Sequence, residues 1–482
     1  MTLELPPVLR EILAALGRAG FRALLVGGAV RDQLLRLPAK DLDVEVYGIS
    51  YDRLADFLAG FGRVDLVGKS FGVVKLSSGD SVWDFSIPRR DSKTGRGHRD
   101  FLASFDPAIT PQEAASRRDF TINALAYDPA SGEVLDFFRG QRDLRNRVLR
   151  AVGPAFSEDP LRVLRGMQFA CRFNLSLDPA TAEMSRGIAS EYTALPKERV
   201  ADEFMKWAVK SPYPGRIGPY LAATGWDVHF SEISALAGVP QDPEWHPEGD
   251  VGTHTMFVLD QAACIAERDG LEGDDRAVLL FAALGHDFAK PATTALRERE
   301  GLGGEKIMRW TSWGHEPAGG PMARGFLNRI GIKNAITAQV VPLIENHLVH
   351  HAIGPEITAR AVRRLAMRLA PASIAQLVRL IEADASGRPP LPPGLPPDAA
   401  RLRDAAAAEA VAERPQPPLI LGRHVLPYFN QRPGKHIGDV THAAYEAQAD
   451  GAFHSEAEAL LWLERYMATH LSSLPQPGRP HR

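Results

Sequence analysis

Cysteine is scarce in this chain of 482 residues, which contains only two. Cys171 and Cys264 lie far apart in apolar surroundings and form no CxxC pair, which argues against a disulfide framework or a cysteine-ligated zinc. The amino terminus lacks a basic leader, and no apolar run approaches the roughly 20 residues of a membrane span. We therefore expect a cytoplasmic protein that contacts no membrane.

A strong excess of one charge is also missing, since 56 Lys and Arg stand against 59 Asp and Glu. This balance gives no overall nucleic-acid signature, so contact with phosphate must come from a local basic patch. One candidate is RGQRDLRNRVLR at 139–150, for which a solvated helical face is the alternative interpretation. No internal repeat is visible, which argues against a solenoid.

Hydrophobic periodicity predicts an α+β protein. Residues 1–145 alternate helix and strand, which indicates a small mixed sheet with helices, and the later segments have helical periodicity. Six prolines between 389 and 397 predict a stiff linker. The predicted segments are the head at 1–145, an all-α neck at 146–225, an all-α histidine-rich domain at 226–388, the linker at 389–398 and a helical tail at 399–482.

Two acidic residues stand in KDLDVEVYG, which otherwise reads as a strand of a buried sheet. Side chains alternate across a strand, so Asp41 and Asp43 should share a face, where two carboxylates repel unless a cation such as Mg²⁺ lies between them. A solvated edge strand is the alternative. Asp84 could add a third carboxylate if its hairpin pairs beside this strand, and a surface aspartate is the alternative there.

Upstream of this strand, LLVGGAVRD predicts a strand, a turn at Gly27 and Gly28, and a helix. The main-chain N–H groups at the start of that helix could bind a phosphate. The alternative interpretation is a tight strand-to-helix connection without a ligand.

The segment EDPLRVLR predicts a helix with Glu158, Asp159 and Arg162 on one side. An aspartate acceptor beside an arginine donor matches the amino group and ring nitrogen of cytosine and adenine, and opposes uracil and guanine. A surface ion-pair cluster is the alternative interpretation.

Histidines gather in the third quarter of the chain, in THTM, LGHDFAKP, GHE and ENHLVHH. The adjacent His286 and Asp287 on an apolar helix are costly to bury without a cation. With His254 and Asp384 they would form a mixed nitrogen and oxygen site suited to nickel, cobalt, manganese or zinc. Such a metal lowers the pKa of bound water and favours hydrolysis of a phosphate ester.

The motifs GGAVRD, DLD, GKSFGVVKL and RRDFTINAL, in this order, resemble the head domain of class II tRNA nucleotidyltransferases and bacterial poly(A) polymerases. The resemblance implies that Asp41 and Asp43 bind the catalytic metals and that residues 91–116 form a flexible loop. It also implies nucleotide binding by Gly27, Gly28, Arg31, Asp32, Arg117, Arg118, Asp119 and Asn123.

EDPLRVLR is similar to the nucleotide-template helix of the same family, which implies base selection by Asp159 and Arg162 and nucleotide binding by Glu158 and Arg165 as well. KERVADEF resembles the last helix motif of that family. Its Arg199 and Glu203 are four residues apart, which predicts a supporting salt bridge with a structural role.

The histidine motifs resemble an HD phosphohydrolase domain, and more closely the one fused to some bacterial CCA-adding enzymes. That resemblance implies 2',3'-cyclic phosphodiesterase, 2'-nucleotidase and phosphatase activity. The implied ligands are His254, His286, Asp287 and Asp384, with His315 and His347 as candidates for a second metal or for phosphate. The proline linker and EWHPEGDVG at 244–252 are less familiar parts.

Together the resemblances imply template-independent addition of CCA to the 3' end of tRNA from CTP and ATP. Mg²⁺ is expected in the head and Ni²⁺ or another divalent transition metal in the HD domain. The alternatives are a poly(A)-, CC-only or A-only enzyme, or a nucleotide phosphohydrolase with an RNA-binding head. The sequence leaves open whether the chain forms a homo-oligomer.

Overall fold

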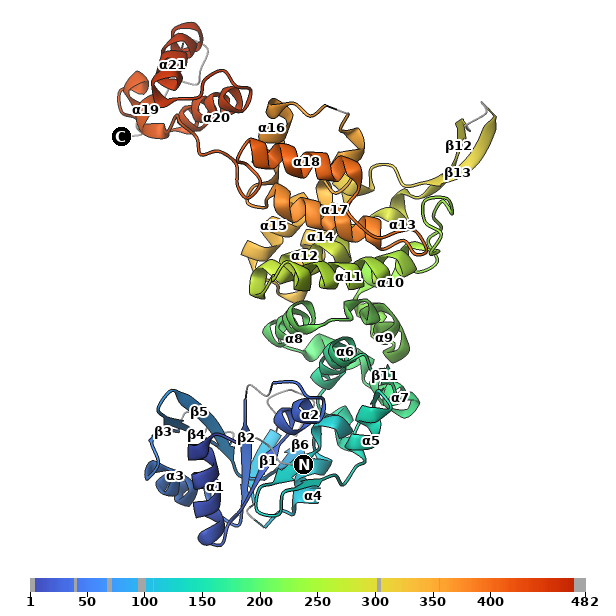
Figure 1. The fold of residues 1–482 in the computed structure, drawn as a ribbon, viewed down its shortest axis with the longest axis vertical. Helices are drawn as coiled ribbons and strands as arrows, with labels where there is room; N and C mark the ends of the chain where they lie inside the picture. The colour runs from blue at the N-terminus through green and yellow to red at the C-terminus, as the bar shows by residue number, and fades with distance from the viewer. Residues whose placement is uncertain are drawn as a thin grey trace. The chain divides into compact units, whose positions relative to one another are not determined.

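The computed structural model describes residues 5–38, 41–66, 72–93, 101–106, 108–300, 305–354 and 356–471. The chain divides into two compact units, Met1–Ser234 and Ala235–Arg482 (Figure 1). The predicted α+β class is confirmed, with a mixed sheet in the first unit and mainly helices elsewhere. No described helix combines the length and the apolar character needed to cross a membrane.

The first unit is built on a seven-stranded sheet with the order β3-β4-β5-β2-β1-β8-β9. Its strands are β1 (Arg22–Val26), β2 (Asp43–Tyr47), β3 (Arg63–Asp65), β4 (Val73–Ser78), β5 (Ser81–Ser86), β8 (Ala126–Asp128) and β9 (Glu133–Leu135). The predicted hairpin is present, because β4 and β5 are antiparallel around a turn at Gly79 and Asp80. β2 and β5 are parallel, and this pairing sets Asp43 beside Asp84.

Helices cover the sheet and continue the first unit. α1 (Pro7–Arg18) buries Leu9, Ile12, Leu13 and Leu16 at helical spacing and packs near β1. The other helices are α2 (Gly28–Leu34), α3 (Tyr51–Ala59), α4 (Pro111–Ser116), α5 (Gly140–Arg145), α6 (Leu161–Phe173), α7 (Pro179–Gly187), α8 (Lys197–Lys210), α9 (Ile217–Thr224) and α10 (Ser231–Ser234). α6 and α8 pack together, so the side chains of both can reach one site.

Part of the segment 91–116, predicted as a loop, is regular. β6 (Arg89–Lys93) pairs with β7 (Phe101–Phe105), and α4 follows with a capping box formed by Thr110 and Glu113. Residues 94–100 and 107 lie outside the described residues, as do residues 68–71 of the GKSFGVVKL motif. The capping box explains α4, because it satisfies free main-chain N–H groups at the start of that helix.

The basic stretch 139–150 is not one continuous helical face. α5 ends at Arg145, Arg147 has a positive φ of 54°, and β10 (Val148–Leu149) then pairs with β11 (Ser176–Leu177). Arg150 forms ion pairs with the buried carboxylates of Asp143 and Asp178. That arginine therefore ties α5 to the start of α7, which makes its role structural.

The second unit is a helical bundle with one hairpin. Its helices are α11 (Val251–Arg268), α12 (Gly273–Gly285), α13 (Lys290–Thr293), α14 (His315–Ile330), α15 (Asn334–Glu345), α16 (Ala359–Leu369), α17 (Ile374–Ser386), α18 (Pro397–Ala408), α19 (Gly422–Val425), α20 (Lys435–Ala449) and α21 (Glu456–His470). β12 (Ala295–Glu300) and β13 (Lys306–Thr311) form the hairpin. α12 packs against α11, α15 and α17, and residues 277–285 of α12 are all buried.

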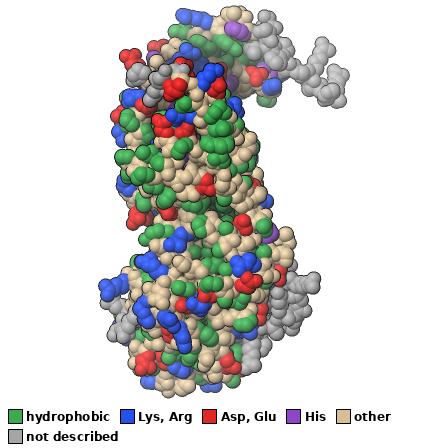
Figure 2. Space-filling model, turned by 90° about the vertical axis from the view of Figure 1, so that its right-hand side faces the viewer, with side chains coloured by type: hydrophobic (Ala, Val, Ile, Leu, Met, Phe, Trp, Pro, Cys, Tyr) green, Lys and Arg blue, Asp and Glu red, His purple; other side chains and the backbone are tan. Residues whose placement is uncertain are grey.

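The proline-rich segment connects elements of this unit. α18, which follows it, packs against α16 and α17, and Pro396 and Pro397 line the same cavity as several histidines. The segment 389–398, predicted as a stiff linker, overlaps this helix, because α18 begins at Pro397. The tail has a small core of its own, in which Phe429, Phe453 and Leu463 are almost fully buried. On the face drawn in Figure 2, basic and acidic side chains are mixed, as the near-neutral composition predicts.

Candidate functional site

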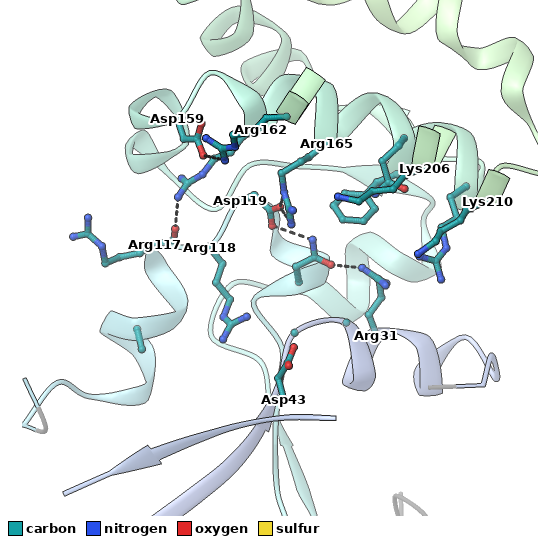
Figure 3. Close-up of a pocket in the computed structure, with 18 of the residues that line it drawn as sticks. Arg31, Asp43, Arg117, Arg118, Asp119, Asp159, Arg162, Arg165, Lys206 and Lys210 are labelled. Carbon is teal, nitrogen blue, oxygen red and sulfur yellow. Dashed lines mark hydrogen bonds and ion pairs between the residues drawn. The ribbon is translucent and has the colours of Figure 1, made fainter. Parts of the chain in front are cut away.

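A cavity of about 580 Å³ in the first unit is lined mainly by charged side chains (Figure 3). Among the described residues that line it, the basic ones are Arg31, Arg117, Arg118, Arg162, Arg165, Arg172, Arg199, Lys206 and Lys210. The acidic ones are Asp43, Glu45, Asp119 and Asp159. This excess of positive charge suits a ligand that carries several phosphate groups.

Most residues expected to bind nucleotide meet in this cavity. Those that line it are Gly27, Gly28, Arg31, Arg117, Arg118, Asp119, Asn123, Asp159, Arg162 and Arg165. Two others do not line it. Asp32 is buried beside Arg31, whose Nε donates to its Oδ1 at 2.8 Å, and Glu158 accepts from Arg117 Nη2 at 3.2 Å. Both carboxylates therefore hold arginines of the cavity in place.

Carboxylates cluster at one end of the cavity. Asp43 begins β2 and lies in register with Asp84 of the parallel strand β5. Exclusion of water raises the pKa of Asp43, and the Asp84 carboxylate raises it further, with a smaller contribution from Asp41. Oxygen ligands held together against their own repulsion fit a hard divalent cation such as Mg²⁺.

Asp41 is not on the strand, contrary to the alternation argument. β2 starts at Asp43, and Asp41 is an exposed residue two positions earlier. It is still close enough to influence the pKa of Asp43. The pairing between Asp43 and Val26 also brings the turn that follows β1 next to these carboxylates.

That turn requires glycine. Gly27 has a φ of 72°, in the left-handed region where a side chain is strained. A Cβ at residue 27 would lie 3.0 Å from Arg118 Nη1, which is tighter than normal packing allows. The absence of a side chain therefore lets Arg118 approach the main chain beside Asp43.

A chain of buried hydrogen bonds fixes the middle of the site. Arg31 Nη1 donates to Asn123 Oδ1 at 2.5 Å, and Asn123 Nδ2 donates to Asp119 Oδ1 at 2.9 Å. Arg165 Nε donates to Asp119 Oδ2 at 2.8 Å. Burial alone would raise the pKa of Asp119, but Arg165 and the hydrogen bonds lower it below its usual value. The two arginines are thus held in fixed positions around the cavity (Figure 3).

The predicted base-reading residues lie at the other end of the cavity from Asp43 (Figure 3). α6 begins only at Leu161, so Glu158 and Asp159 precede the helix, contrary to the prediction. Asp159 is extended, with φ −126° and ψ 104°, because a residue before proline disfavours the helical region. Arg162 donates to the main-chain oxygens of Ala155 and Arg117, which orient its guanidinium.

The predicted salt bridge between Arg199 and Glu203 is replaced by other pairs. Arg199 Nη2 lies 3.3 Å from Asp159 Oδ2, and Lys206 Nζ lies 2.7 Å from Glu203 Oε1. Arg199 therefore belongs to the cavity and not only to the support of α8. Sequence reasoning also missed Glu45, Arg172, Lys206 and Lys210 as lining residues. Spacing by three or four along α6 and α8 was the available signal for the basic ones.

A second site lies within the second unit, where five helices bring the predicted histidines and aspartates together. His254 is on α11, His286 and Asp287 follow α12, His315 begins α14, His347 follows α15 and Asp384 is on α17. His254 Nε2 lies 3.0 Å from Asp384 Oδ1 and 3.9 Å from Asp287 Oδ2. Asp287 lies near two histidines at once, with Oδ2 3.2 Å from His286 Nε2 and Oδ1 3.4 Å from His315 Nε2.

The histidine tautomers suit metal binding. The Nδ1 atoms of His286, His315 and His347 lie 2.8, 2.6 and 2.7 Å from main-chain carbonyl oxygens. A carbonyl oxygen can only accept, so each Nδ1 must carry the hydrogen and each neutral ring turns an Nε2 lone pair toward the cluster. His315 Nε2 and His347 Nε2 are only 3.2 Å apart, which calls for a cation or a proton between them.

Unpartnered polar atoms support the same conclusion. His286 Nε2 and both carboxylate oxygens of Asp287 are buried and have no hydrogen-bond partner of good geometry, although Lys290 Nζ lies 2.8 Å from Asp287 Oδ2. Burial would raise the pKa of Asp287, but His286 and Lys290 lower it well below its usual range. The Asp287 carboxylate belongs to two groups of possible ligands, one with His254 and His286 and the other with His315 and His347. Such mixed nitrogen and oxygen groups fit a divalent transition metal, and each oxygen of Asp287 could bind one ion.

The less familiar stretch 244–252 supplies residues that sequence reasoning missed. Glu248 Oε1 lies 2.7 Å from His254 Nδ1 and 2.9 Å from His246 Nδ1. Burial would raise the pKa of Glu248, but these two hydrogen bonds lower it to about 2. Burial lowers the pKa of His254, while hydrogen bonds to Asp384 and Glu248 raise it to about 9. Glu248 thus fixes which nitrogen of His254 faces the cluster, as a carboxylate does behind many metal-binding histidines.

Comparison with known proteins matches both parts of the chain. Residues 23–150 match the family model of the Poly A polymerase head domain, and residues 251–383 match that of the HD domain. The Multifunctional CCA protein of Xanthomonas campestris pv. campestris (strain B100) is 39% identical over 375 residues, which cover 76% of this chain and 85% of that protein. The Multifunctional CCA protein of Nitrosococcus oceani is 36% identical over 399 residues, covering 81% and 91%.

Solved structures share the fold. The CCA-adding enzyme of Bacillus stearothermophilus in complex with CTP aligns with a TM-score of 0.62 at 21% identity, over 97% of this chain and 100% of that one. The CCA-adding enzyme of Thermotoga maritima complexed with tRNA aligns with a TM-score of 0.54 at 17% identity, over 96% of each chain. The sequence identity and coverage of the first group of relatives show that this chain belongs to the family of multifunctional CCA proteins.

Proposed function

We propose that this chain adds CCA to the 3' end of tRNA, using CTP and ATP and releasing pyrophosphate. The observation that carries the proposal is a single cavity with Asp43 at one end, Asp159 and Arg162 at the other, and basic side chains around it. Cation-binding carboxylates, a phosphate-binding surface and a base-reading pair are what nucleotide transfer without a template requires. The names of the relatives and of the solved neighbours support the same reaction.

In this reaction the 3'-hydroxyl oxygen of the RNA forms a bond to the α-phosphorus of the nucleotide. The bond from that phosphorus to the β-phosphate oxygen breaks, pyrophosphate leaves, and the hydroxyl proton passes to solvent. Mg²⁺ held by Asp41, Asp43 and Asp84 would activate the hydroxyl and stabilise the leaving pyrophosphate. Arg31, which is held by Asn123, and Arg118, which lies beside the Gly27 turn, would bind the triphosphate.

Asp159 and Arg162 would select the base. The Arg162 guanidinium is already oriented by two main-chain oxygens, and the Asp159 carboxylate accepts hydrogen bonds only. Cytosine and adenine offer an amino group to such an acceptor, whereas uracil and guanine offer a carbonyl oxygen that repels it. Arg199 would hold Asp159 in position through their ion pair.

Asp159→Asn is expected to relax this selection, because an amide can donate to the carbonyl of uracil. We expect the preference for CTP over UTP to fall by about 1–3 kcal/mol, the usual worth of one good base contact. The measurement is kcat/KM for single incorporation of each nucleotide into tRNA. Asp202→Asn, which changes an exposed aspartate of α8 outside the cavity, is the matched control. An unchanged CTP to UTP ratio in Asp159→Asn contradicts the assignment.

The histidines and aspartates gathered in the second unit, called the HD cluster below, would give the chain a second activity. This activity is the hydrolysis of 2',3'-cyclic phosphodiesters, 2'-nucleotides and phosphomonoesters. In such a step an oxygen of water bonds to phosphorus, one ester bond breaks, and the released oxygen takes up a proton. The ligands would be His254, His286, Asp287 and Asp384, with His315 and His347 completing a second position. A divalent transition metal there, such as Ni²⁺, would supply an acidified water as nucleophile. Lys290 would offset negative charge on the phosphate from beside Asp287.

The CCA proposal is tested with purified protein, Mg²⁺ and tRNA that lacks its terminal CCA. We expect C to be incorporated with CTP alone, A to follow only after C, and extension to stop after three nucleotides. Gel analysis with each nucleotide singly and with both together measures this. A long run of A would indicate a poly(A) enzyme, termination after CC or acceptance only of tRNA ending in CC would indicate a partial enzyme, and no incorporation would refute nucleotide transfer.

A further inference from the structure

The cavity of the HD cluster has an aromatic rim. This cavity, of about 920 Å³, is lined by Trp245, Trp310 and Trp313, which are 58%, 36% and 54% exposed. The chain has seven tryptophans, and these three are the ones that stay this exposed. Exposed large aromatic side chains are unusual on a protein surface, and their gathering around one cavity marks a binding surface.

The chain itself links this rim to the cluster. Trp245 directly precedes His246, whose Nδ1 shares Glu248 with His254. Trp313 stands two residues before His315, and Trp310 lies near the end of β13. A ligand whose aromatic part is held by these indoles would therefore place the group bonded to that part close to the histidines and Asp287.

Basic groups accompany the aromatic rings. The guanidinium carbons of Arg297 and Arg299 each lie 4.6 Å from the centre of the Trp313 ring. Arg299, Lys290 and Arg388 line the cavity. Of the carboxylates around it, Asp287 and Asp384 belong to the cluster, Asp242 pairs with Arg309, and Glu316 and Asp398 remain at the rim. Stacking surfaces interleaved with arginines are typical of proteins that bind single-stranded nucleic acid.

The number of rings and the size of the cavity indicate more than one nucleotide. A free phosphate ester needs only the cluster and Lys290, and a mononucleotide can stack on one indole. The cavity volume is near the upper end of the 300–1,000 Å³ that is typical of small-molecule sites. Three indoles offer stacking surfaces to neighbouring bases as well.

We propose that the HD cavity binds the end of a single-stranded RNA, with its terminal 2'- or 2',3'-cyclic phosphate at the cluster and the adjacent bases stacked on Trp313 and its neighbours. This substrate class rests on the phosphohydrolase activity proposed above. The Trp313 ring binds a base, and the residues of the HD cluster catalyse the hydrolysis. With the 2',3'-cyclic phosphate, water adds to phosphorus, one P–O bond to the ribose breaks and the freed ribose oxygen takes up a proton, so the RNA ends in a phosphomonoester. With the 2'-phosphate, the same attack releases inorganic phosphate and leaves a 2'-hydroxyl. In both cases the RNA keeps its length.

The test compares three substrates with the full-length, metal-loaded protein: a four-nucleotide RNA ending in a 2',3'-cyclic phosphate, the matching cyclic mononucleotide, and an alkyl phosphate without a base. We expect the highest kcat/KM for the RNA. Trp313→Ala should lower that value by about 5- to 150-fold, the equivalent of about 1–3 kcal/mol for one stacked base. Hydrolysis of the alkyl phosphate should stay unchanged, and Trp313→Phe should restore most of the loss.

Met308→Ala is the matched control, because Met308 is 57% exposed on the same hairpin and does not line the cavity. Equal kcat/KM for RNA and mononucleotide in the unmodified protein would overturn the proposal. So would an equal loss on all three substrates in Trp313→Ala, or the same loss in Met308→Ala.

A second measurement separates this proposal from the phosphohydrolase activity. Ultraviolet crosslinking of the same RNA, mapped by mass spectrometry, should mark peptides that contain Trp245, Trp310 or Trp313. If no substrate is hydrolysed but these peptides are crosslinked, the activity fails and the RNA surface stands. Crosslinks confined to residues 1–234 would overturn the RNA surface whatever the hydrolysis result.

Discussion

Asp43→Asn is expected to lower nucleotide addition to tRNA by more than about 100-fold, because loss of even an indirect partner of a metal site usually costs about 10–100-fold. Of the three predicted metal-binding carboxylates, Asp43 is the one that lines the nucleotide cavity, and burial together with its neighbours Asp84 and Asp41 raises its pKa. Asparagine keeps the shape but removes the charge that attracts Mg²⁺. The measurement is single-turnover incorporation of C into tRNA that lacks CCA, followed over a range of Mg²⁺ concentrations.

The same variant should keep the folded state and the HD activity. Asp43 pairs with no cation within ion-pair distance among the described residues, so its charge contributes little to stability. Asp80→Asn, in the turn between β4 and β5, changes an exposed aspartate outside the site and should extend tRNA normally. We expect Asp84→Asn to impair addition as well, since its carboxylate lies in register with Asp43. Full activity of Asp43→Asn would exclude it as a metal ligand.

Several elements of the first unit could be predicted because their signals are local. The β4–β5 hairpin follows from a Gly-Asp turn between two alternating runs, and α8 begins and ends where the periodicity of KERVADEFMKWAVK places it. β6 and β7 were missed because RRDSK and FLASF carry no clear alternation. The late start of α6 could have been predicted from Pro160, which restrains Asp159 to the extended region.

Contacts between segments far apart in the chain could not be predicted from the sequence. Arg199 has a possible partner at the helical spacing of four, Glu203, yet its guanidinium bonds to Asp159, 40 residues earlier. Local spacing shows only which pairs are possible, and the packing of α6 against α8 decides between them. Glu248 gave no signal at all, because it lies six residues before His254 and outside the helix that carries this histidine. Only the fold shows that its carboxylate reaches His254 Nδ1.

His254, His286, Asp287 and Asp384 could be predicted from residue types, because histidine and aspartate are rarely buried together without a cation, whereas His315 and His347 followed only from the resemblance to the HD domain. The structure adds the shared role of Asp287. Its oxygens face His286 and His254 on one side and His315 on the other, which no spacing rule could supply. This central position makes Asp287 the most informative residue of the second site to replace.

Asp287→Asn is expected to abolish metal binding and to lower hydrolysis of a 2',3'-cyclic nucleotide by more than about 100-fold, while CCA addition survives. An amide oxygen is a weak ligand, and the amide nitrogen would point a donor at one of the histidine groups. Metal content after dialysis against Ni²⁺, read by mass spectrometry, measures the first effect. The second readout is thermal: Ni²⁺ should raise the Tm of the unmodified protein, because a ligand that binds only the folded state stabilises it, and should leave the Tm of the variant unchanged.

Asp274→Asn, at an exposed position of α12, is the control that should keep both responses. Without metal the variant should unfold earlier than the unmodified protein, since it leaves the buried Lys290 and the neighbouring histidines without the carboxylate that pairs with them. Loss of CCA addition together with hydrolysis in a folded variant would contradict two separate sites, and retained Ni²⁺ binding would exclude Asp287 as the shared ligand.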